Sequence, residues 1–387
     1  MTSEASFTAF DEQCMTRALQ LAAEACGLAS PNPTVGCVLA RGADVLAEGA
    51  HLYDQRDHAE IAALKQAAAR GHSTSGATAY VTLEPCSHHG RTGPCADALL
   101  AAGIARCVVA TADPNPLVRG RGIARLRAAG VAVQVGLLAE PARRLNDAFA
   151  HVMQQRRPFV TLKAALSVDG KLAPNPSRRT GAHPVWITGP VARAYVQTIR
   201  HTQDAVLTGI GTVLADDPAL TDRSGLPRRR RLLRVVLDSQ LRTPLTSQLV
   251  RTADRDLLLV HSHSAQQQQR SALTAAGAEL LALPMDHDRL SLKALLDELA
   301  RRDILSLLLE AGAEINGAFL AQGLVDQAML FFGETELGED AVPFASGVAS
   351  PYLLQQSLRR TTNRTLGPDA LLIGYLHDPW QALQAEG

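Results

Sequence analysis

The side chains best suited to chemistry are His58, Glu60, Cys86 and Cys95. Zinc favours imidazole and thiolate ligands, and a catalytic zinc takes three protein ligands while a fourth position stays open to water. His58, Cys86 and Cys95 would supply the three, and zinc lowers the pKa of a water to about 7. Because Glu60 is two residues from a ligand, it could carry protons between that water and a leaving amine. The set predicts a hydrolytic zinc site.

Two structural interpretations compete with a hydrolytic site. A closed zinc knuckle would use His58 or His88 as its fourth ligand, but such a site does not need Glu60. Alternatively the cysteines are core residues and His58 is a surface histidine. H-x-E with a proline-led cysteine pair is typical of zinc-dependent base deaminases, in which the pair usually reads P-C-x-x-C. Here eight residues separate Cys86 from Cys95.

Strands and helices alternate around these residues. Asp57 stands where a helix N-cap is expected, with Glu60 three residues on, and the helix should continue to Gly71. Residues 77–83 have the pattern of a strand, which Glu84-Pro85 ends, and a first helix is expected over residues 12–26. The alternation predicts a three-layer α/β/α domain.

A second α/β pattern begins at Phe159, after the segment QRRPF. FVTLKAALS, RLLRVVLDSQ, RDLLLVHS and ILSLLLEAG have the pattern of strands, with helical stretches between the later ones. The chain of 387 residues is too long for one ordinary core. We therefore expect two domains, at residues 1–152 and 158–387.

The composition of the chain limits the classes of partner that the protein is expected to bind. The chain has 38 basic and 38 acidic residues, so no overall positive field favours nucleic acid or an anionic membrane. No apolar run approaches the roughly 20 residues that cross a bilayer, and MTSEASFTAFDEQ is unlike a signal peptide. All six cysteines lie in the first 107 residues, which favours reduced thiols and metal ligation. We expect a cytoplasmic protein with a small-molecule substrate.

One biased segment has two interpretations. PRRRRLLR, at residues 227–234, could be a phosphate-binding patch or a solvated face, and charge runs are more often the latter.

The cysteine loop resembles a known family. The string PCSHHGRTGPC, with PNPTVGCV before it and DPNPLVRGRG after it, closely resembles the cytidine-deaminase-like domain of the bifunctional riboflavin-biosynthesis deaminase-reductases. That domain removes the 2-amino group of 2,5-diamino-6-ribosylamino-4(3H)-pyrimidinone 5′-phosphate. The resemblance implies zinc ligands at His58, Cys86 and Cys95 and a proton donor at Glu60. It further implies substrate contacts at Asn32, His51 and Arg91.

These contacts have simpler alternatives. Asn32 between two prolines could be a turn former, and His51 and Arg91 need geometry to support them. Gly93 stands where the family string has a proline.

The second half resembles the reductase of the same family through KAALSVDGK, WITGP, TGIGTVLADDPALTDR and LLLEAGAEINGAF. The resemblance implies a dihydrofolate-reductase-like fold in which NADPH delivers hydride to C1′ of the ribose. Lys163 is the candidate for polarising the reacting centre. The implied nucleotide contacts are Ala165, Trp186, Thr212, Asp216, Ser239, Gly312, Ala313, Glu314, Ile315, Asn316, Gly317 and Ala318. The implied substrate contacts are Arg200, Leu220, Arg223 and Glu310.

Taken singly, several of these residues have other interpretations. Trp186 could be core, Glu310 could be a salt-bridge partner at a strand end, and a glycine loop before a helix is a weak nucleotide signal. Pro184 stands where the family has a substrate-contacting serine, and FFGETELG lacks an expected proline.

Two other functions are compatible with parts of the sequence. A tRNA or nucleotide deaminase with an unrelated C-terminal module is disfavoured by neutral charge, the long cysteine spacing and LADDPAL. A catalytically inactive zinc- and nucleotide-binding protein that regulates the pathway is disfavoured by Glu60. The family implies a homo-oligomer, either a dimer or a tetramer.

Overall fold

The computed structural model describes residues 6–88, 93–178, 185–347 and 350–381. These residues form two compact units. Residues 6–155, 227–229 and 379–381 belong to the first unit, and residues 156–226 and 230–378 belong to the second. Among the described residues, no helix combines the length and the apolar character that crossing a bilayer requires.

The first unit is built on a five-stranded sheet in the order β2-β1-β3-β4-β5. β1 is antiparallel to β2 and β3, whereas β3, β4 and β5 run parallel. The strands are β1 (Gly36–Arg41), β2 (Asp44–Ala50), β3 (Thr78–Val81), β4 (Arg106–Val109) and β5 (Ala132–Val135).

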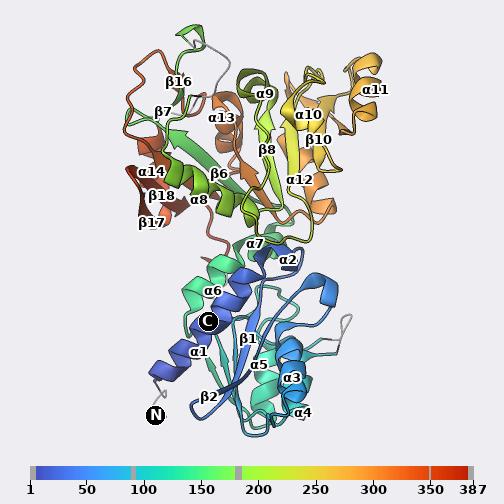
Figure 1. Ribbon diagram of the computed structural model, residues 1–387, viewed down its shortest axis with the longest axis vertical. Helices are drawn as coiled ribbons and strands as arrows, with labels where there is room; N and C mark the ends of the chain where they lie inside the picture. The colour runs from blue at the N-terminus through green and yellow to red at the C-terminus, as the bar shows by residue number, and fades with distance from the viewer. Residues whose placement is uncertain (1–5, 89–92, 179–184, 348–349, 382–387) are drawn as a thin grey trace. The chain divides into compact units, whose positions relative to one another are not determined.

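Helices cover both faces of this sheet (Figure 1). α1 (Ala9–Glu24) and α6 (Ala139–Leu145) pack on one face, where the core includes Met15 and Val38. On the other face lie α3 (Ala59–Ala69), α4 (Cys95–Ala101) and α5 (Arg121–Ala128), around a core that includes Leu39 and Leu99. Alternate residues of β1 therefore face opposite layers, as a two-sided sheet requires. The predicted three-layer α/β/α domain is confirmed. The remaining elements of this unit are α2 (Cys26–Ala29), α7 (Asp147–Gln155) and a 3-10 turn at Tyr53–Gln55.

Two predicted helix starts were wrong. α1 begins at Ala9, earlier than residue 12, because Thr8 and Asp11 form a reciprocal capping box. α3 has His58 as its N-cap instead of Asp57. The Asp57 carboxylate pairs with Lys65, at 2.6 and 2.9 Å, and is not bound to the helix backbone.

The second unit contains a nine-stranded sheet in the order β11-β10-β9-β8-β14-β6-β15-β18-β17. The seven strands from β11 to β15 run parallel, and β18 and β17 add an antiparallel edge. The strands are β6 (Phe159–Leu166), β8 (Ala205–Gly209), β9 (Leu233–Leu237), β10 (Leu257–Ser262), β11 (Glu279–Leu283), β14 (Ser306–Leu309), β15 (Gln327–Phe332), β17 (Arg359–Leu366) and β18 (Asp369–Tyr375). Two short ladders pair β7 (Lys171–Ala173) with β16 (Val342–Pro343) and β12 (Met285–Asp286) with β13 (Arg289–Leu290).

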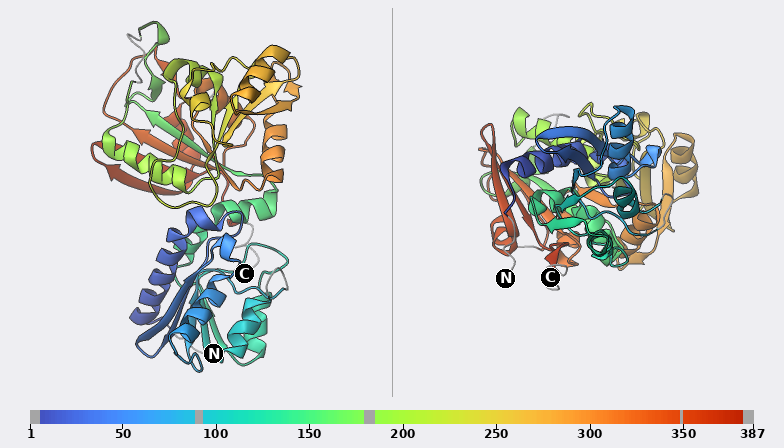
Figure 2. Two further views of the ribbon diagram at one scale, coloured as in Figure 1. Left: turned by 45° about the vertical axis from the view of Figure 1, so that its right-hand side comes forward. Right: turned by 90° about the horizontal axis from the view of Figure 1, so that it is seen from below.

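Helices also flank this sheet on both faces, as Figure 2 shows from two further directions. One core includes apolar residues of α12 and α13, and the opposite core includes residues of α8, α9, α10 and α11. The helices are α8 (Pro190–His201), α9 (Ile210–Asp216), α10 (Gln248–Arg251), α11 (Gln267–Ala275), α12 (Leu292–Arg301), α13 (Ala313–Ala321) and α14 (Pro351–Ser357). A 3-10 turn spans Pro176–Arg178. The second α/β unit predicted from the sequence is confirmed.

Two residues of the arginine run make ion pairs inside the second unit. Arg230 donates to the carbonyl of Asp303 at 2.8 Å and contacts Asp204. Arg231 forms a salt bridge with Asp254. Both arginines keep solvent exposure while paired with acidic residues, which favours the solvated-face interpretation over a phosphate-binding patch.

Candidate active sites

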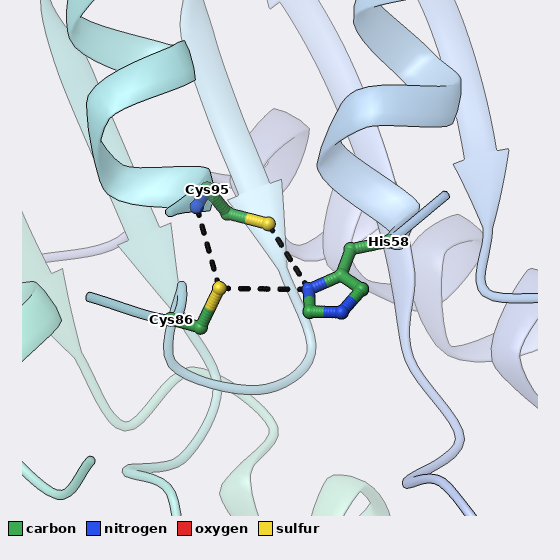
Figure 3. A group of neighbouring side chains, drawn as sticks. All are labelled: His58, Cys86 and Cys95. Atoms are coloured by element: carbon green, nitrogen blue, oxygen red, sulfur yellow. Dashed lines mark hydrogen bonds between the residues drawn. The ribbon is translucent and has the colours of Figure 1, made fainter. Parts of the chain in front are cut away.

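His58, Cys86 and Cys95 converge in the first unit (Figure 3). The Nδ1 atom of His58 lies 3.5 Å from the Cys86 Sγ and 3.2 Å from the Cys95 Sγ. All three ligand atoms lie within 4.8 Å of one another, so they could bind a single ion. Within the part of the chain that the structure describes, no other group of three His, Cys, Asp or Glu side chains meets this condition.

Three different elements position these side chains. His58 is the N-cap of α3, Cys86 lies in the loop after β3, and Cys95 is the first residue of α4. The backbone N–H of Cys95 donates to the Cys86 Sγ at 3.3 Å, and the N–H of Ala96 donates to the Cys86 carbonyl at 3.1 Å. The start of α4 therefore holds both the side-chain sulfur and the backbone carbonyl of Cys86.

The donor set fits zinc. Hydrogen bonds from the Cys95 thiol and from His58 lower the pKa of Cys86, so that its thiol is readily ionised. The thiolate is the form of cysteine that binds metal, and one imidazole with two thiolates is a common zinc set. His88, the alternative ligand of a closed knuckle, is exposed and is not a member of the group.

Glu60 lies beside the group and is buried. It stands in the first turn of α3 and is 3% exposed. Burial raises the pKa of its carboxyl to about 7, and nearby His58 only partly offsets this effect. A carboxyl with a pKa near neutrality can both take up and release a proton at physiological pH.

Asn32 and His51 are joined in a short hydrogen-bond chain next to His58. The carbonyl of Asp57 can only accept, so the His51 Nδ1, at 2.7 Å, must carry the proton. The His51 Nε2 is then an acceptor for the Asn32 amide, at 2.9 Å. Burial lowers the pKa of His51, which keeps its ring neutral. The Asn32 side chain is therefore held by His51 and not by its own turn.

The ring of His51 lies edge-on to that of His58, with centroids 5.5 Å apart. The structure thus brings two of the three substrate residues predicted for this unit beside the metal group. The third, Arg91, lies outside the described residues.

In the second unit, two helix starts lie side by side at the carboxyl ends of neighbouring strands. Gly209 is the last residue of β8 and the N-cap of α9, and Gly312 is the N-cap of α13, shortly after β14. A Cβ on Gly209 would lie 2.3 Å from the Ile315 Cδ1, and one on Gly312 would lie 4.0 Å from the Thr212 Oγ1. Free backbone N–H groups at the start of a helix such as α13 suit the phosphates of a dinucleotide.

The other predicted nucleotide residues differ in their surroundings. Trp186 is 63% exposed, and the Arg193 guanidinium lies 4.7 Å from its ring centroid, so the core interpretation of Trp186 was wrong. Asn316 is fully buried and its amide donates to the Phe344 carbonyl at 3.1 Å. A Cβ on Gly317 would lie 2.1 Å from the Ser346 carbonyl oxygen. Asn316 and Gly317 therefore position the chain at residues 344–346.

The other residues predicted to contact the nucleotide lie on β6, α9, α13 and the chain after β9. Ala165 lies on β6, Asp216 ends α9, and the Ser239 carbonyl accepts two hydrogen bonds from Ser262. The remaining members, Ala313, Glu314, Ile315 and Ala318, lie on α13. Their contact with a nucleotide stays a prediction.

Lys163, Arg200 and Glu310 form a buried charged group. The Arg200 guanidinium donates twice to the Glu310 carboxylate, at 2.7 and 3.0 Å, and the Lys163 Nζ lies 3.5 Å from it. Burial raises the pKa of Glu310, but the two cations outweigh burial and hold the pKa at about 2. The salt-bridge interpretation of Glu310 is confirmed by these contacts. Lys163 lies in the carboxyl-terminal half of β6, and its Nζ lies between the Glu310 carboxylate and the Phe331 ring.

Acid should weaken the second unit through Glu310. A carboxyl with a pKa of about 2 in the folded state and about 4.3 when unfolded stabilises the fold above pH 4.5. This stabilisation, about 3 kcal/mol, is lost as the pH falls from about 4.5 toward 2. We expect urea unfolding between pH 6 and 3 to show roughly half of this loss in the wild type and much less of it in Glu310→Gln. Glu279→Gln, which removes an exposed partner of Arg302, should behave as the wild type. Equal acid sensitivity of all three proteins would contradict this expectation.

Two further predicted substrate residues have different exposure. Leu220 is 4% exposed and packs in the core of the second unit, with a positive φ of 51°. Arg223 is exposed, and its backbone N–H donates to the Gln197 side chain at 3.0 Å. Of the two, only Arg223 presents a side chain that can meet a phosphate in solution.

Two groups that support the predicted site residues were not among the residues predicted from the sequence. They are the Asp57 carbonyl, which holds His51, and Arg193, which lies over Trp186. A backbone carbonyl has no sequence signal, whereas an arginine seven residues after an exposed tryptophan, one turn into α8, is at least compatible with a cation–π contact.

Both halves of the chain match known protein families. The family described as "Cytidine and deoxycytidylate deaminase zinc-binding region" matches residues 8–111, and "RibD C-terminal domain" matches residues 158–372. Riboflavin biosynthesis protein RibD of Actinobacillus pleuropneumoniae is 40% identical over 368 residues, which are 94% of this chain and 95% of that protein. The protein of the same name from Escherichia coli is 40% identical over 342 residues, 86% of this chain and 89% of that protein.

Two solved structures are similar over nearly the whole chain. Acinetobacter baumannii RibD has a TM-score of 0.78 and 36% identity, covering 95% of this chain and 98% of that one. A diaminohydroxyphosphoribosylaminopyrimidine deaminase/5-amino-6-(5-phosphoribosylamino)uracil reductase from Thermotoga maritima has a TM-score of 0.79 and 32% identity, with the same coverage.

Proposed function

The chain belongs to the RibD family of riboflavin-biosynthesis deaminase-reductases, and from that premise we propose which of its side chains carry the two reactions. It is a bifunctional enzyme that uses zinc and NADPH. It removes the 2-amino group of 2,5-diamino-6-ribosylamino-4(3H)-pyrimidinone 5′-phosphate by hydrolysis, releasing ammonia, and then reduces the ribosyl group to ribityl. The alternative with an unrelated C-terminal module is wrong, because residues 158–372 match the reductase family.

The convergence of His58, Cys86 and Cys95 beside buried Glu60 is the observation that carries the deaminase assignment. We assign the three as the zinc ligands. When bound, zinc supplies Lewis-acid activation of water at neutral pH. Glu60, buried beside the three ligands, takes a proton from the attacking water and passes it to the leaving 2-amino group.

Asn32 and His51 hold the pyrimidine in this proposal. Because the Asn32 amide N–H is bound to His51, its Oδ1 is left to accept a hydrogen bond from a ring N–H. His51 acts by fixing this orientation. Arg91 is proposed to meet the 5′-phosphate, on the family resemblance alone.

Replacing Asn32 with alanine should weaken substrate binding more than catalysis. One hydrogen bond to the pyrimidine is lost, so the KM for deamination should rise roughly 3- to 10-fold. Zinc content should not change, because Asn32 is not in the metal group. Steady-state ammonia release with metal analysis checks this, and an unchanged KM would remove Asn32 from the substrate site.

The charged group around Glu310 carries the reductase assignment. When bound, NADPH supplies the hydride. Glu310 holds Lys163 close to the end of β6, where its ammonium polarises the carbon–oxygen or carbon–nitrogen bond being reduced. Arg200 keeps Glu310 ionised, and Arg223 is the exposed cation proposed for the substrate phosphate. The nucleotide is proposed to lie along the starts of α9 and α13, with Trp186 over its exposed edge.

Lys163→Met should lower reduction and spare deamination. The ammonium is proposed to stabilise charge that develops during hydride transfer, and losing one such group costs roughly 10²- to 10³-fold in kcat. NADPH oxidation with the deaminated intermediate as substrate measures the loss. Lys293→Met, which removes an exposed ion pair with Asp297, is the matched control. Reduction at the wild-type rate by folded Lys163→Met would exclude Lys163 from the reaction.

Separate assays on the full chain test the division of labour. Ammonia release without NADPH reports the deaminase, proposed at residues 1–152, and NADPH oxidation on the deaminated intermediate reports the reductase, proposed at residues 158–387. Each site variant should affect only one assay. A folded variant of either site that loses both activities would contradict the assignment.

Location and assembly are also proposals. All six cysteines are free thiols, which supports a reducing compartment such as the cytoplasm. A homodimer or tetramer is proposed from the family resemblance and can be measured by sedimentation.

A further inference from the structure

Glu84 is a buried carboxylate that neither proposed reaction uses. It is 3% exposed and stands two residues before Cys86, just beyond β3. Its own backbone N–H donates to the Thr111 carbonyl at 3.0 Å, which joins this stretch to the chain after β4. The sequence pattern suggested only that Glu84 ends a strand.

Four backbone N–H groups donate to the Glu84 carboxylate. Oε2 accepts from Asp113 at 3.2 Å and from Gly120 at 2.8 Å. Oε1 accepts from Gly122 at 2.9 Å and from Ile123 at 3.2 Å. Gly120 is the N-cap of α5, which has no side-chain cap from its own N-cap residue. The carboxylate therefore satisfies N–H groups that the first turn of a helix leaves unpaired, where the helix dipole also favours a negative charge.

The chain that leads to Cys86 touches α5 directly. A Cβ on Gly122 would lie 1.9 Å from the Pro85 carbonyl oxygen, so only glycine allows this approach. On its other side, Cys86 is bound by the N–H groups of Cys95 and Ala96. Cys86 is thus held between the starts of α4 and α5.

We propose that Glu84 is a positioning residue for the metal group. By anchoring the chain before Cys86 to the first turn of α5, its carboxylate sets the place of the Cys86 Sγ relative to His58 and Cys95. The inference rests on the proposed role of Cys86 as a zinc ligand. A residue that only stabilised the fold would change the unfolding temperature without changing the affinity or geometry of the metal group.

Glu84→Gln in the full chain tests this role, because an amide N–H would then face the backbone donors. Zinc affinity is measured by competition with a chromophoric chelator, and ligand geometry by absorption of the cobalt-substituted protein, in which cysteine ligands give a thiolate band. We expect zinc affinity to fall roughly 10- to 100-fold and the cobalt bands to shift. NADPH oxidation by the Glu84→Gln protein, with the deaminated intermediate as substrate, should be unchanged.

Asp97→Asn is the matched control. Asp97 pairs with Arg125, so this variant also removes a contact between α4 and α5 but leaves the chain at residues 84–86 untouched. It should show the zinc affinity and cobalt spectrum of the wild type.

A folded Glu84→Gln protein with wild-type zinc affinity and cobalt spectrum would overturn the proposal. If this variant does not fold, Glu84→Asp keeps the charge on a shorter side chain that cannot reach all four donors, and an unchanged cobalt spectrum would likewise overturn it. Cys86→Ser separates the proposal from its premise. If Cys86→Ser keeps the full thiolate band, Cys86 is not a ligand and the premise fails; a reduced band with an unchanged Glu84→Gln spectrum refutes only the role of Glu84.

Discussion

Glu60→Gln should slow ammonia release severely while the protein keeps its zinc. Glutamine has nearly the shape of glutamate but cannot take up or release the proton, and general acid–base groups contribute roughly 10²- to 10⁴-fold to the rate. Glu60 is the buried carboxyl that lies beside His58, Cys86 and Cys95, and its position suits this role. The kcat for deamination should fall by that factor.

The measurement combines ammonia release, zinc content and NADPH oxidation on the full chain. Zinc content should be unchanged, and so should NADPH oxidation when the deaminated intermediate is supplied, because neither depends on the Glu60 proton. Glu48→Gln is the matched control, since it removes a carboxylate of the same unit that pairs with Arg17 outside the metal group. Normal deamination by Glu60→Gln would remove this residue from the mechanism.

Cys86→Ser should lose zinc and deamination together. The Cys86 thiolate is one of three proposed ligands, and serine is a far weaker zinc ligand at neutral pH. We expect zinc content to fall well below one ion per chain and ammonia release to fall to background. Reduction of the deaminated intermediate should continue, because that site lies in the second compact unit.

Cys107→Ala is the control for removing a buried thiol. Cys107 lies on β4 in the core and outside the metal group, so this variant should keep one zinc per chain. If Cys86→Ser retains zinc and deaminates normally, the ligand assignment is wrong.

The metal group could be predicted from the sequence because zinc constrains residue types. His58, Cys86 and Cys95 are the residues that zinc prefers, and H-x-E with a proline-led cysteine narrows the chemistry further. The eight-residue gap between the cysteines then distinguishes this loop from P-C-x-x-C deaminases. Strand and helix patterning predicted both α/β units for a similar reason, since alternating apolar positions follow directly from burial.

The supporting contacts could not be predicted because they depend on backbone groups brought together by the fold. Asp57 had the residue type of an N-cap, yet His58 occupies that position and the Asp57 carbonyl binds His51. Glu84 binds N–H groups up to 39 residues away, at the start of α5. Such contacts carry no local pattern in the sequence.

The reductase site shows the same limit for side chains. The sequence left Glu310 between a substrate contact and a salt bridge, and only the fold brings Arg200 and Lys163 to its carboxylate. Trp186 has the residue type of a core side chain, yet it is mostly exposed in the segment before α8. Its ring contacts the Arg193 guanidinium. Residue type alone does not show which partner a side chain meets.

The most direct test of the account is product identification from the full chain, supplied with the diaminopyrimidinone phosphate with and without NADPH. Without NADPH, ammonia and the deaminated ribosyl compound should accumulate. With NADPH, the ribityl compound should form, with one NADPH oxidised for each ammonia released. Accumulation of the deaminated ribosyl compound in the presence of unconsumed NADPH would contradict the account.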